Sequence, residues 1–265
     1  RLPRHISYIP YGTFEGCTSL KRIEMPETSN NNFKEGIRIG KRAFARCTSL
    51  ENIGLPSDTV KLDNEIFLDC KSLKEISFNN GLKVIGDAVF SGCDALISIL
   101  LPASLEQIGY AAFINCVRLE TVNGLENTKI ETLQNETFKG CINLTEIKLP
   151  TQIQSIGPFV FYDCRSLENI DIFKTDISYI GIAAFQNCYN LKECALPRKV
   201  KRIEKFTFKS CTQLKSIKMA PDIEEIGISA FFGCNMLNEI DLHNKSSLRQ
   251  LGNDAFAGCH RLEKM

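Results

Sequence analysis

The sequence predicts a repeat solenoid, an extended array in which short structural units stack upon one another. Eleven copies of the phrase Phe-x-x-Cys-x-x-Leu run along the 265 residues, and successive cysteines of the phrase are 30, 23, 23, 23, 25, 23, 24, 23, 23 and 25 residues apart. A self-similar period between about 20 and 50 residues is the signature of a solenoid. Residues 1–265 are therefore expected to form a single array of about eleven repeats of roughly 23 residues. The cysteines of the phrase are Cys17, Cys47, Cys70, Cys93, Cys116, Cys141, Cys164, Cys188, Cys211, Cys234 and Cys259.

Each repeat is predicted to contain one short strand. In the repeat from Leu82 to Leu105, Ile99-x-Leu101 shows the period-2 alternation of a half-buried strand, and Pro102 ends it because proline cannot donate to a ladder. One strand per repeat, stacked in parallel, predicts a curved sheet with the bulkier turns on the outer side. The Phe-x-x-Cys-x-x-Leu segment predicts a helical or 3₁₀ turn with three inward residues. The glycine before that segment predicts a turn with unusual backbone angles, and it recurs at Gly40, Gly86, Gly109, Gly157, Gly181, Gly227 and Gly252.

The repeated cysteines are predicted to form a buried ladder of free thiols. Eleven of the twelve cysteines hold the same position in successive repeats, so they should stack one per repeat. Their Cβ atoms would lie about 5 Å apart, as neighbouring strands do, whereas a disulfide prefers roughly 3.8 Å. The remaining one, Cys194, stands where most repeats have Ile, and it is expected to pack in the core as a small hydrophobic residue.

Composition and charge exclude several classes of protein. The formal net charge of +1 argues against a bulk affinity for nucleic acid or for a membrane surface, and no run of 18 apolar residues predicts a membrane span. The chain begins at Arg1 and ends at Met265 within repeats, so a fragment that lacks one or both polar caps is expected. No histidine has a nucleophile or an acid at a catalytic spacing, no Cys-x-x-Cys pair predicts zinc, and no glycine loop predicts a phosphate site. We therefore expect no catalytic residues, metal or cofactor.

The phrase Ile-Gly-x-x-Ala-Phe-x-x-Cys-x-x-Leu-x-x-Ile-x-Leu-Pro resembles the BspA-like (Treponema pallidum-type) leucine-rich repeat. Ile108–Cys116 and Leu144–Pro150 carry its two halves, and the resemblance covers nearly the whole chain. It implies a leucine-rich-repeat horseshoe or gently curved solenoid, with a curved parallel β-sheet on the concave face and short helical or 3₁₀ turns. It also implies a surface or secreted protein that adheres to host proteins or other cells. Two endings depart from the phrase, Val122-Asn123-Gly124 and Asp171-Ile172-Phe173, and we expect them to alter the strand edge and not the fold.

The concave face is the first candidate for ligand binding. In a leucine-rich strand the residues five and seven positions after each Cys face this surface, and here they vary freely while the core positions repeat. Such variation suits recognition, but it also suits plain solvated positions. The candidate residues are Arg22, Glu24, Glu75, Ser77, Ser98, Leu100, Thr121, Asn123, Glu146, Lys148, Asn169, Asp171, Lys218 and Asp241. Those from Ser77 to Asn123 form an uncharged window around one apolar side chain, which is typical of an interface, although a single exposed Leu is also common elsewhere.

Two further candidates lie outside that face. Arg198, Lys199, Lys201, Arg202 and Lys205 form a basic patch for an anionic partner such as a sulfated glycan, with a solvated edge neutralised by nearby carboxylates as the alternative. The longest step, between Cys17 and Cys47, carries the insertion Thr28–Phe33, which is either a binding loop or an inert surface loop.

Together these features predict a non-enzymatic interaction module at a cell surface or in secreted form. Its partner would be a protein or glycoprotein, such as a component of a host surface or matrix, bound through the concave face. A structural spacer that presents a separate domain is one alternative. An intracellular scaffold is another, because a ladder of reduced thiols is compatible with that compartment.

Overall fold

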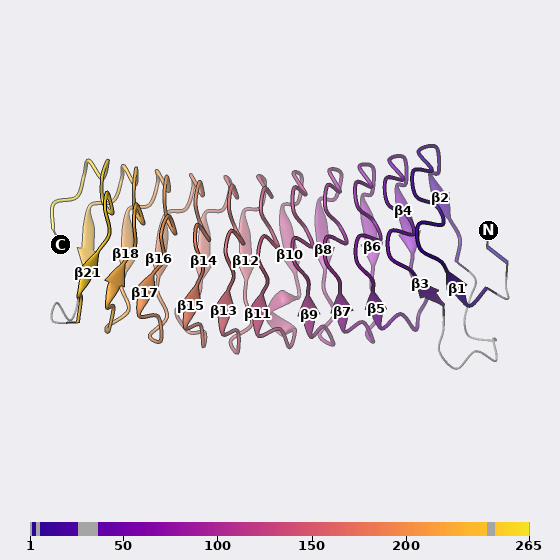
Figure 1. Ribbon diagram of the computed structural model, residues 1–265, viewed down its shortest axis with the longest axis horizontal. Coiled ribbons are helices and arrows are strands. Elements are labelled where there is room, and N and C mark those ends of the chain that lie inside the picture. Colours follow the sequence, from indigo (N-terminus) through magenta and orange to yellow (C-terminus); the bar gives the residue numbers. More distant parts are fainter. Residues whose placement is uncertain (1, 4–5, 26–36, 243–246, 265) are drawn as a thin grey trace.

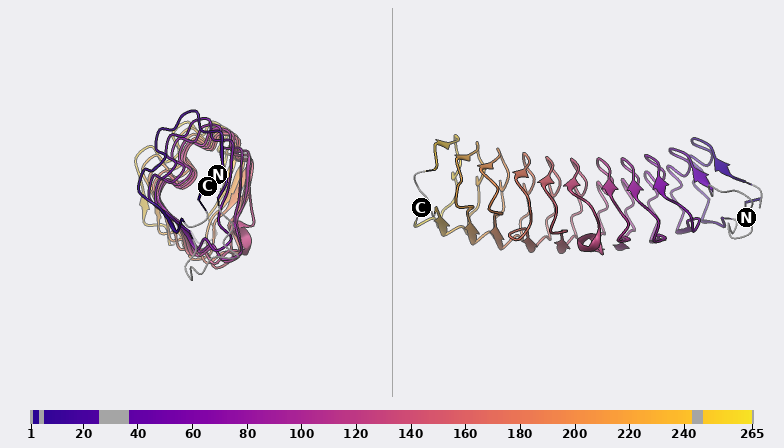
Figure 2. Two further views of the ribbon diagram at one scale, coloured as in Figure 1. Left: turned by 90° about the vertical axis from the view of Figure 1, so that its right-hand side faces the viewer. Right: turned by 90° about the horizontal axis from the view of Figure 1, so that it is seen from below.

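The computed structural model describes residues 2–3, 6–25, 37–242 and 247–264 of the chain. These residues form a long, gently bent solenoid whose N- and C-terminal ends lie at opposite extremes (Figure 1). Seen along the array, successive coils project onto nearly one outline (Figure 2). The predicted repeat solenoid is thus confirmed, in its gently curved form. The candidate insertion Thr28–Phe33 lies outside the described residues.

The predicted strand of each repeat joins a parallel ladder. Within the described residues the order is β2-β4-β6 in one sheet and β8-β10-β12-β14-β16-β18-β20 in the next, with β6 beside β8. In β6, β8 and β12 the middle residue is buried and its two neighbours are exposed, as the alternation predicts. We call the exposed side of these strands the long-sheet face. The strands are β2 (Arg22–Ile23), β4 (Asn52–Gly54), β6 (Glu75–Ser77), β8 (Ser98–Leu100), β10 (Thr121–Asn123), β12 (Glu146–Lys148), β14 (Asn169–Asp171), β16 (Glu193–Ala195), β18 (Ser216–Lys218) and β20 (Glu239–Asp241).

A second parallel ladder, which the sequence did not predict, runs along another side of the solenoid (Figure 1). Each of its strands has two residues, too few for an alternation to be recognised in sequence. They pair in the groups β1-β3, β5-β7-β9, β11-β13-β15 and β17-β19-β21. The strands are β1 (Tyr8–Ile9), β3 (Arg38–Ile39), β5 (Lys61–Leu62), β7 (Val84–Ile85), β9 (Gln107–Ile108), β11 (Thr132–Leu133), β13 (Ser155–Ile156), β15 (Tyr179–Ile180), β17 (Arg202–Ile203), β19 (Glu225–Ile226) and β21 (Gln250–Leu251).

The Phe-x-x-Cys-x-x-Leu segments are hydrogen-bonded turns and not the predicted helical or 3₁₀ turns. The amide of Cys116 donates to the carbonyl of Phe113 at 3.2 Å, which closes a turn, but the amide of Phe113 donates to Thr137 of the next repeat at 2.9 Å. Because amides alternate between these two kinds of partner, the segment cannot continue as a helix. In the described part of the chain the single helix is η1 (Leu125–Asn127), a 3₁₀ turn that begins after Gly124.

The glycine before each Phe segment does not have the unusual backbone angles that we predicted. None of the seven has a positive φ, which falls instead on residues two positions later, such as Ala111 (φ 51°). A Cβ added at Gly109 would lie 2.5 Å from the carbonyl carbon of Gly86, and real Cβ atoms do not approach backbone so closely. The glycine is therefore needed because the backbones of successive repeats nearly touch there.

Replacing Gly109 with Ala should destabilise the array by about 3 kcal/mol, because the backbone contact with Gly86 must open to admit a methyl group. Gly54→Ala is the matched control, since no atom lies within 4 Å of a Cβ built at this exposed position of β4. We expect the control to change the free energy of unfolding by less than about 0.5 kcal/mol. Urea unfolding followed by circular dichroism measures both. Equal losses in the two variants would contradict the close-approach role.

The core is a continuous spine of stacked side chains. Eleven phenylalanine rings, from Phe14 to Phe256, stack in order with centroids 5.2–5.9 Å apart. Those from Phe44 to Phe231 are fully buried, and the Leu and Ile ladders pack against them in a single cluster. Since each repeat covers the apolar side chains of its neighbours, no repeat has a core of its own.

The cysteine ladder is confirmed, and it does more than fill space. All twelve thiols are free. Each repeat thiol from Cys47 to Cys259 donates to the carbonyl oxygen of the Phe in the preceding repeat, for example Cys116 Sγ to Phe90 O at 3.0 Å and Cys141 Sγ to Phe113 O at 3.2 Å. The thiols thus link consecutive turns by hydrogen bonds, a role that treating them as small hydrophobic residues missed.

Thiol titration should reveal two accessible groups in the native protein and twelve after denaturation without reductant. Cys17 is exposed and Cys259 is half-buried, whereas the other ten are buried and therefore react slowly. Ellman's reagent at neutral pH, with and without guanidinium chloride, measures both numbers. A denatured count near zero would show disulfides, and rapid reaction of most native thiols would show that the ladder is open.

Candidate functional site

The long-sheet face brings the predicted ligand-binding residues together in one surface. All of them lie in its strands except Glu24, which directly follows β2. They are exposed, apart from the half-buried Thr121; the side chain of Asp241 lies outside the described part. The residue columns are in register, since Glu146 pairs with Asn169 and Lys148 with Asp171. The face is therefore a regular array of side chains on a rigid support.

The uncharged window spans three neighbouring strands. Ser77 ends β6, Ser98 and Leu100 lie on β8, and Thr121 and Asn123 lie on β10. Leu100 is paired with Asn123, and 67% of its surface is exposed. Ile97, which directly precedes β8, is also exposed.

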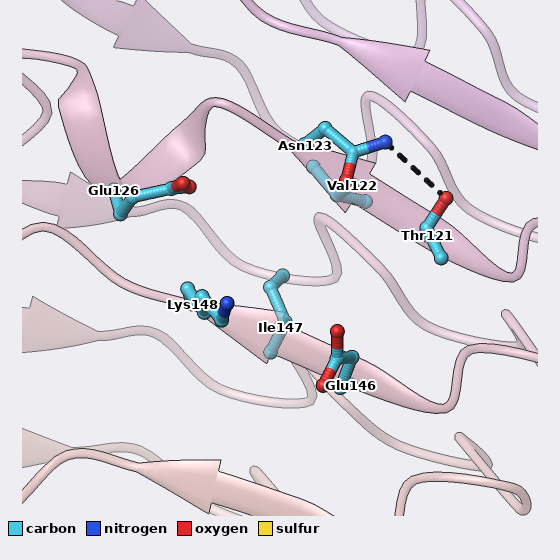
Figure 3. Close-up of a pocket in the computed structure, with 7 residues that line it drawn as sticks. All are labelled: Thr121, Val122, Asn123, Glu126, Glu146, Ile147 and Lys148. Atoms are coloured by element: carbon cyan, nitrogen blue, oxygen red, sulfur yellow. Dashed lines mark hydrogen bonds between the residues drawn. The ribbon is translucent and has the colours of Figure 1, made fainter.

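A small hollow of about 50 Å³ opens between β10 and β12 (Figure 3). The Asn123 amide donates to the Thr121 hydroxyl at 3.4 Å along one wall, and Glu126 of η1 stands at one end (Figure 3). Gly124 makes the sharp departure from β10 possible: its φ is 80°, and a Cβ there would meet the carbonyl oxygen of Leu101 at 2.4 Å. The lining residues are Thr121, Val122, Asn123, Glu126, Glu146, Ile147 and Lys148.

A larger hollow of about 390 Å³ lies over β14, β16 and β18. Its lining includes the small Ala195 and the buried Cys194, together with Asp171, Glu193 and Lys218. Burial, followed by the charge of Asp171, raises the pKa of the Cys194 thiol to about 12. The thiol is therefore neutral at physiological pH and is not a nucleophile.

Both hollows coincide with the two departures from the repeat phrase. β10 and β12 pair over two residues, and β14 and β16 pair only at Asn169 and Glu193, whereas β16 and β18 pair over three. These are the repeats in which the cysteine steps are 25 and 24 residues. After Asp171 the chain turns at once, with its carboxylate accepting the amide of Phe173 at 3.3 Å. The strands thus pair over fewer residues where the repeat length is irregular. The two endings that we expected to alter the strand edge each lie beside a hollow in the sheet.

Charges around the larger hollow are not paired in the usual way. Elsewhere, Lys192 contacts Glu168 across neighbouring repeats and Lys74 contacts Glu51 at 2.9 Å. Among the residues that the structure describes, no basic group lies within ion-pair distance of Asp171 or Glu193. The Lys218 ammonium instead lies 4.8 Å from the centre of the Phe173 ring. Glu193 and Ala195 line this hollow; they occupy the predicted columns of the face, five and seven positions after Cys188, but were not among the candidate residues.

The predicted basic patch is largely neutralised by neighbouring repeats. Lys199 contacts Asp176, Lys201 lies 3.1 Å from Glu224, and Arg202 lies 2.8 Å from Glu225. Lys201 holds the pKa of the Glu224 carboxyl below its ordinary value. In the described residues, Arg198 and Lys205 have no such carboxylate, so two of the five predicted side chains keep an unpaired charge.

Within the described residues, no group of three or more His, Cys, Asp or Glu side chains could hold a metal ion. None of the described helices has the length and apolar character needed to cross a membrane.

Comparison with known proteins identifies the repeat. A family model described as a BspA type leucine rich repeat region (6 copies) matches residues 1–35, 29–141 and 131–263. No curated protein matches the chain. The crystal structure of a leucine-rich repeat protein from Bacteroides ovatus is 28% identical with a TM-score of 0.59, over 96% of this chain and 80% of that one.

Two other solved structures share the fold at lower identity. A leucine rich cell surface protein from Faecalibacterium prausnitzii is 22% identical with a TM-score of 0.54, over 97% of this chain and 76% of that one. The pneumococcal vaccine antigen PcpA is 24% identical with a TM-score of 0.55, over 80% of this chain and 60% of that one.

Proposed function

The chain belongs to the BspA-type leucine-rich repeat family, and on that premise we propose that it is a non-enzymatic interaction module. It binds a protein or glycoprotein ligand, such as a component of a host surface or matrix, through its long-sheet face. We place it at a cell surface or in secreted form. Two structural neighbours described as a cell surface protein and a vaccine antigen support that location.

One observation carries the proposal: along the same strands, the buried positions repeat while the exposed ones change chemistry. In β8 the exposed pair is Ser98 and Leu100, and in β12 it is Glu146 and Lys148, although the residue between them is a buried Ile in both. The rigid core holds these side chains in fixed positions before a ligand arrives, which reduces the ordering cost of binding. A regular scaffold with a non-regular, hollowed face suits recognition of one extended surface.

The experiment is a binding panel with immobilised fibronectin, fibrinogen, mucins, sulfated glycans and host cell surfaces. A variant with Glu75→Ala, Leu100→Ala, Lys148→Ala and Asp171→Ala tests the face, because these exposed residues are spread along it. The matched control carries Lys41→Ala and Lys129→Ala, which remove exposed charges away from the face. Saturable binding that the first variant loses and the control keeps would support the proposal.

A structural spacer is the second candidate, and the unbroken core along the whole described array favours it. The absence of binding to every component of the panel would favour the spacer. Binding that is equal in the face variant and in the unchanged protein would also favour it. An intracellular scaffold would instead bind proteins of its own cell, and immobilised lysate proteins added to the panel distinguish it.

An anionic partner at the basic patch is a separate, weaker proposal. Because Lys199, Lys201 and Arg202 have carboxylate partners, only Arg198 and Lys205 offer free charge. Elution from heparin near physiological salt would leave this proposal without support. Retention that Arg198→Ala with Lys205→Ala abolishes would favour it.

A further inference from the structure

One position of the repeat decides where the second ladder is interrupted. It lies four residues before each Phe of the repeat phrase, and after the first repeat it holds glycine except at Asp63, Gln134 and Glu204. We call the contact between one repeat and the next a junction. The three gaps in the second ladder, before β5, β11 and β17, fall at the junctions made by these three residues, and every closed junction has glycine. We propose that Glu204 marks a hinge, at which the coil with β14 and β15 opens from the coil with β16 and β17.

Glycine closes a junction because it lets the backbones of successive repeats come together. A Cβ built at any of the seven glycines would lie 2.3–2.9 Å from a backbone atom of the preceding repeat, which is closer than real Cβ atoms come. In its absence the glycine amide reaches the preceding strand of the second ladder, as from Gly181 to the Ile156 carbonyl at 2.8 Å. A residue that has a Cβ therefore keeps the two repeats further apart.

The backbone hydrogen bonds of the second ladder follow the same division. At each closed junction one amide just before the strand and the glycine amide just after it both donate to the preceding repeat; Ser178 donates to Gln154 at 3.0 Å in this way. At the three junctions without glycine, the described residues make neither bond. The turn that starts at Glu204 is itself intact, since the Thr207 hydroxyl donates to the Glu204 carbonyl at 2.7 Å. What the substitution removes is thus the bonding between repeats.

The junction at Glu204 is the weakest of the three, because the long ladder is also interrupted there (Figure 1). Across it β14 and β16 pair only at Asn169 and Glu193. The corresponding strands pair over three residues at the Gln134 junction and over two at the Asp63 junction. The hollow of about 390 Å³ lies over the same pair of strands. Two sides of the solenoid are therefore loosened at one junction.

The third side, formed by the Phe-x-x-Cys-x-x-Leu turns, remains bonded and serves as the axis of the hinge. The amides of Phe159, Phe161 and Asp163 donate to carbonyls of the next turn at 2.8–2.9 Å, and the rings of Phe161 and Phe185 stack 5.4 Å apart. The Cys188 thiol donates to the Phe161 carbonyl at 3.1 Å. Opening on the other two sides leaves these contacts in place.

Side chains that span the loosened sides are weak ties. They are the exposed ion pairs of Lys192 with Glu168 and of Lys199 with Asp176, and the contact of Lys218 with the Phe173 ring. Exposed ion pairs contribute little to stability, so these contacts limit the opening without preventing it. The inference goes beyond the proposed function, since it concerns how the array moves and not what it binds. Because the junction crosses the long-sheet face, opening changes the spacing of that face at the hollow.

Hydrogen exchange of the ¹⁵N-labelled protein, corrected for the intrinsic rate of each sequence, tests the hinge. In the unchanged protein, amides of residues 193–204 should exchange at least about tenfold faster than the equivalent amides of residues 216–227. Glu204→Gly should slow exchange of the amide at position 204 by about tenfold, which corresponds to one added hydrogen bond to the Ile180 carbonyl. Glu204→Ala is the matched control, because it removes the same carboxylate and keeps a Cβ, so it should leave exchange unchanged.

Equal protection of the two segments in the unchanged protein would overturn the hinge. Equal slowing in both variants would also overturn it, since the charge of Glu204 and not its Cβ would then separate the repeats. A folded Glu204→Gly variant without slower exchange would show that glycine does not close the junction. Gly227→Ala gives the converse test, and it should speed exchange of the amide at position 227 by opening a closed junction.

Discussion

The protein should lose stability steeply as the pH rises above about 9, because its core contains ten buried neutral thiols. Burial raises the pKa of Cys47 to about 11 and of Cys194 to about 12, and it raises the pKa values of Cys93, Cys116 and Cys141 well above the ordinary value of a thiol. An unfolded thiol ionises near pH 8.5, so above that pH the unfolded chain releases protons that the folded chain keeps. Each such thiol should then lower the free energy of unfolding by about 1.4 kcal/mol per pH unit.

The buried thiols contribute fully to the free energy of unfolding below the pKa that a thiol has in the unfolded chain. This contribution is lost as the pH rises from that value toward the raised pKa values of the folded protein. Several thiols acting together would remove the usual 5–15 kcal/mol of a folded domain within roughly one or two pH units. Urea unfolding at pH 7.5, 8.5, 9.5 and 10.5 measures the loss. Replacing Cys116, Cys141 and Cys164 with Ser should reduce the slope by about three-tenths, since three of the ten buried thiols are removed. A midpoint that stays constant up to pH 10.5 would contradict a core of neutral thiols.

Phe138→Ala should cost about 3–5 kcal/mol, because it empties the centre of the ring stack. Phe138 is fully buried, and its ring lies 5.4 Å from that of Phe113 and 5.9 Å from that of Phe161. Its neighbours cannot close the gap, since each is fixed by the backbone hydrogen bonds of its own turn. Chemical unfolding of purified protein measures the change.

Phe232→Ala is the matched control, since its ring lies on the surface of the same kind of turn and is 40% exposed. It contacts the ammonium of Lys209 at 5.3 Å, so we expect a loss of at most about 1 kcal/mol. If Phe138→Ala costs no more than the control, the stack is not what stabilises the array. A partial unfolding transition in Phe138→Ala would show that the array divides at the vacated repeat.

Much of the fold could be predicted from sequence because the repeat itself carries the information. Identical letters at a fixed spacing must occupy equivalent places, so the parallel strand, the Phe stack and the buried thiols followed directly from the pattern. The sequence pattern predicted that the glycine before each Phe is required, but the predicted cause, unusual backbone angles, was wrong. At Gly109 the constraint is the close approach of the Gly86 backbone, which is a contact between repeats. The prediction of a helical or 3₁₀ turn was also wrong because of a contact between repeats. The Phe113 amide donates to the Thr137 carbonyl in the next repeat and not to a carbonyl of its own segment.

The candidate site was less accessible to sequence reasoning. The sequence by itself determined which residues are exposed on the long-sheet face, because alternation along a strand decides which side each residue takes. It also located both irregular endings, after Val122 and after Asp171. Only the tertiary structure decided that these endings open the sheet, that Lys218 reaches over Ala195 to Phe173, and that Asp171 and Glu193 share one hollow. Repetition is local and can be read along one chain, whereas a hollow depends on how far neighbouring repeats separate, which no single repeat encodes.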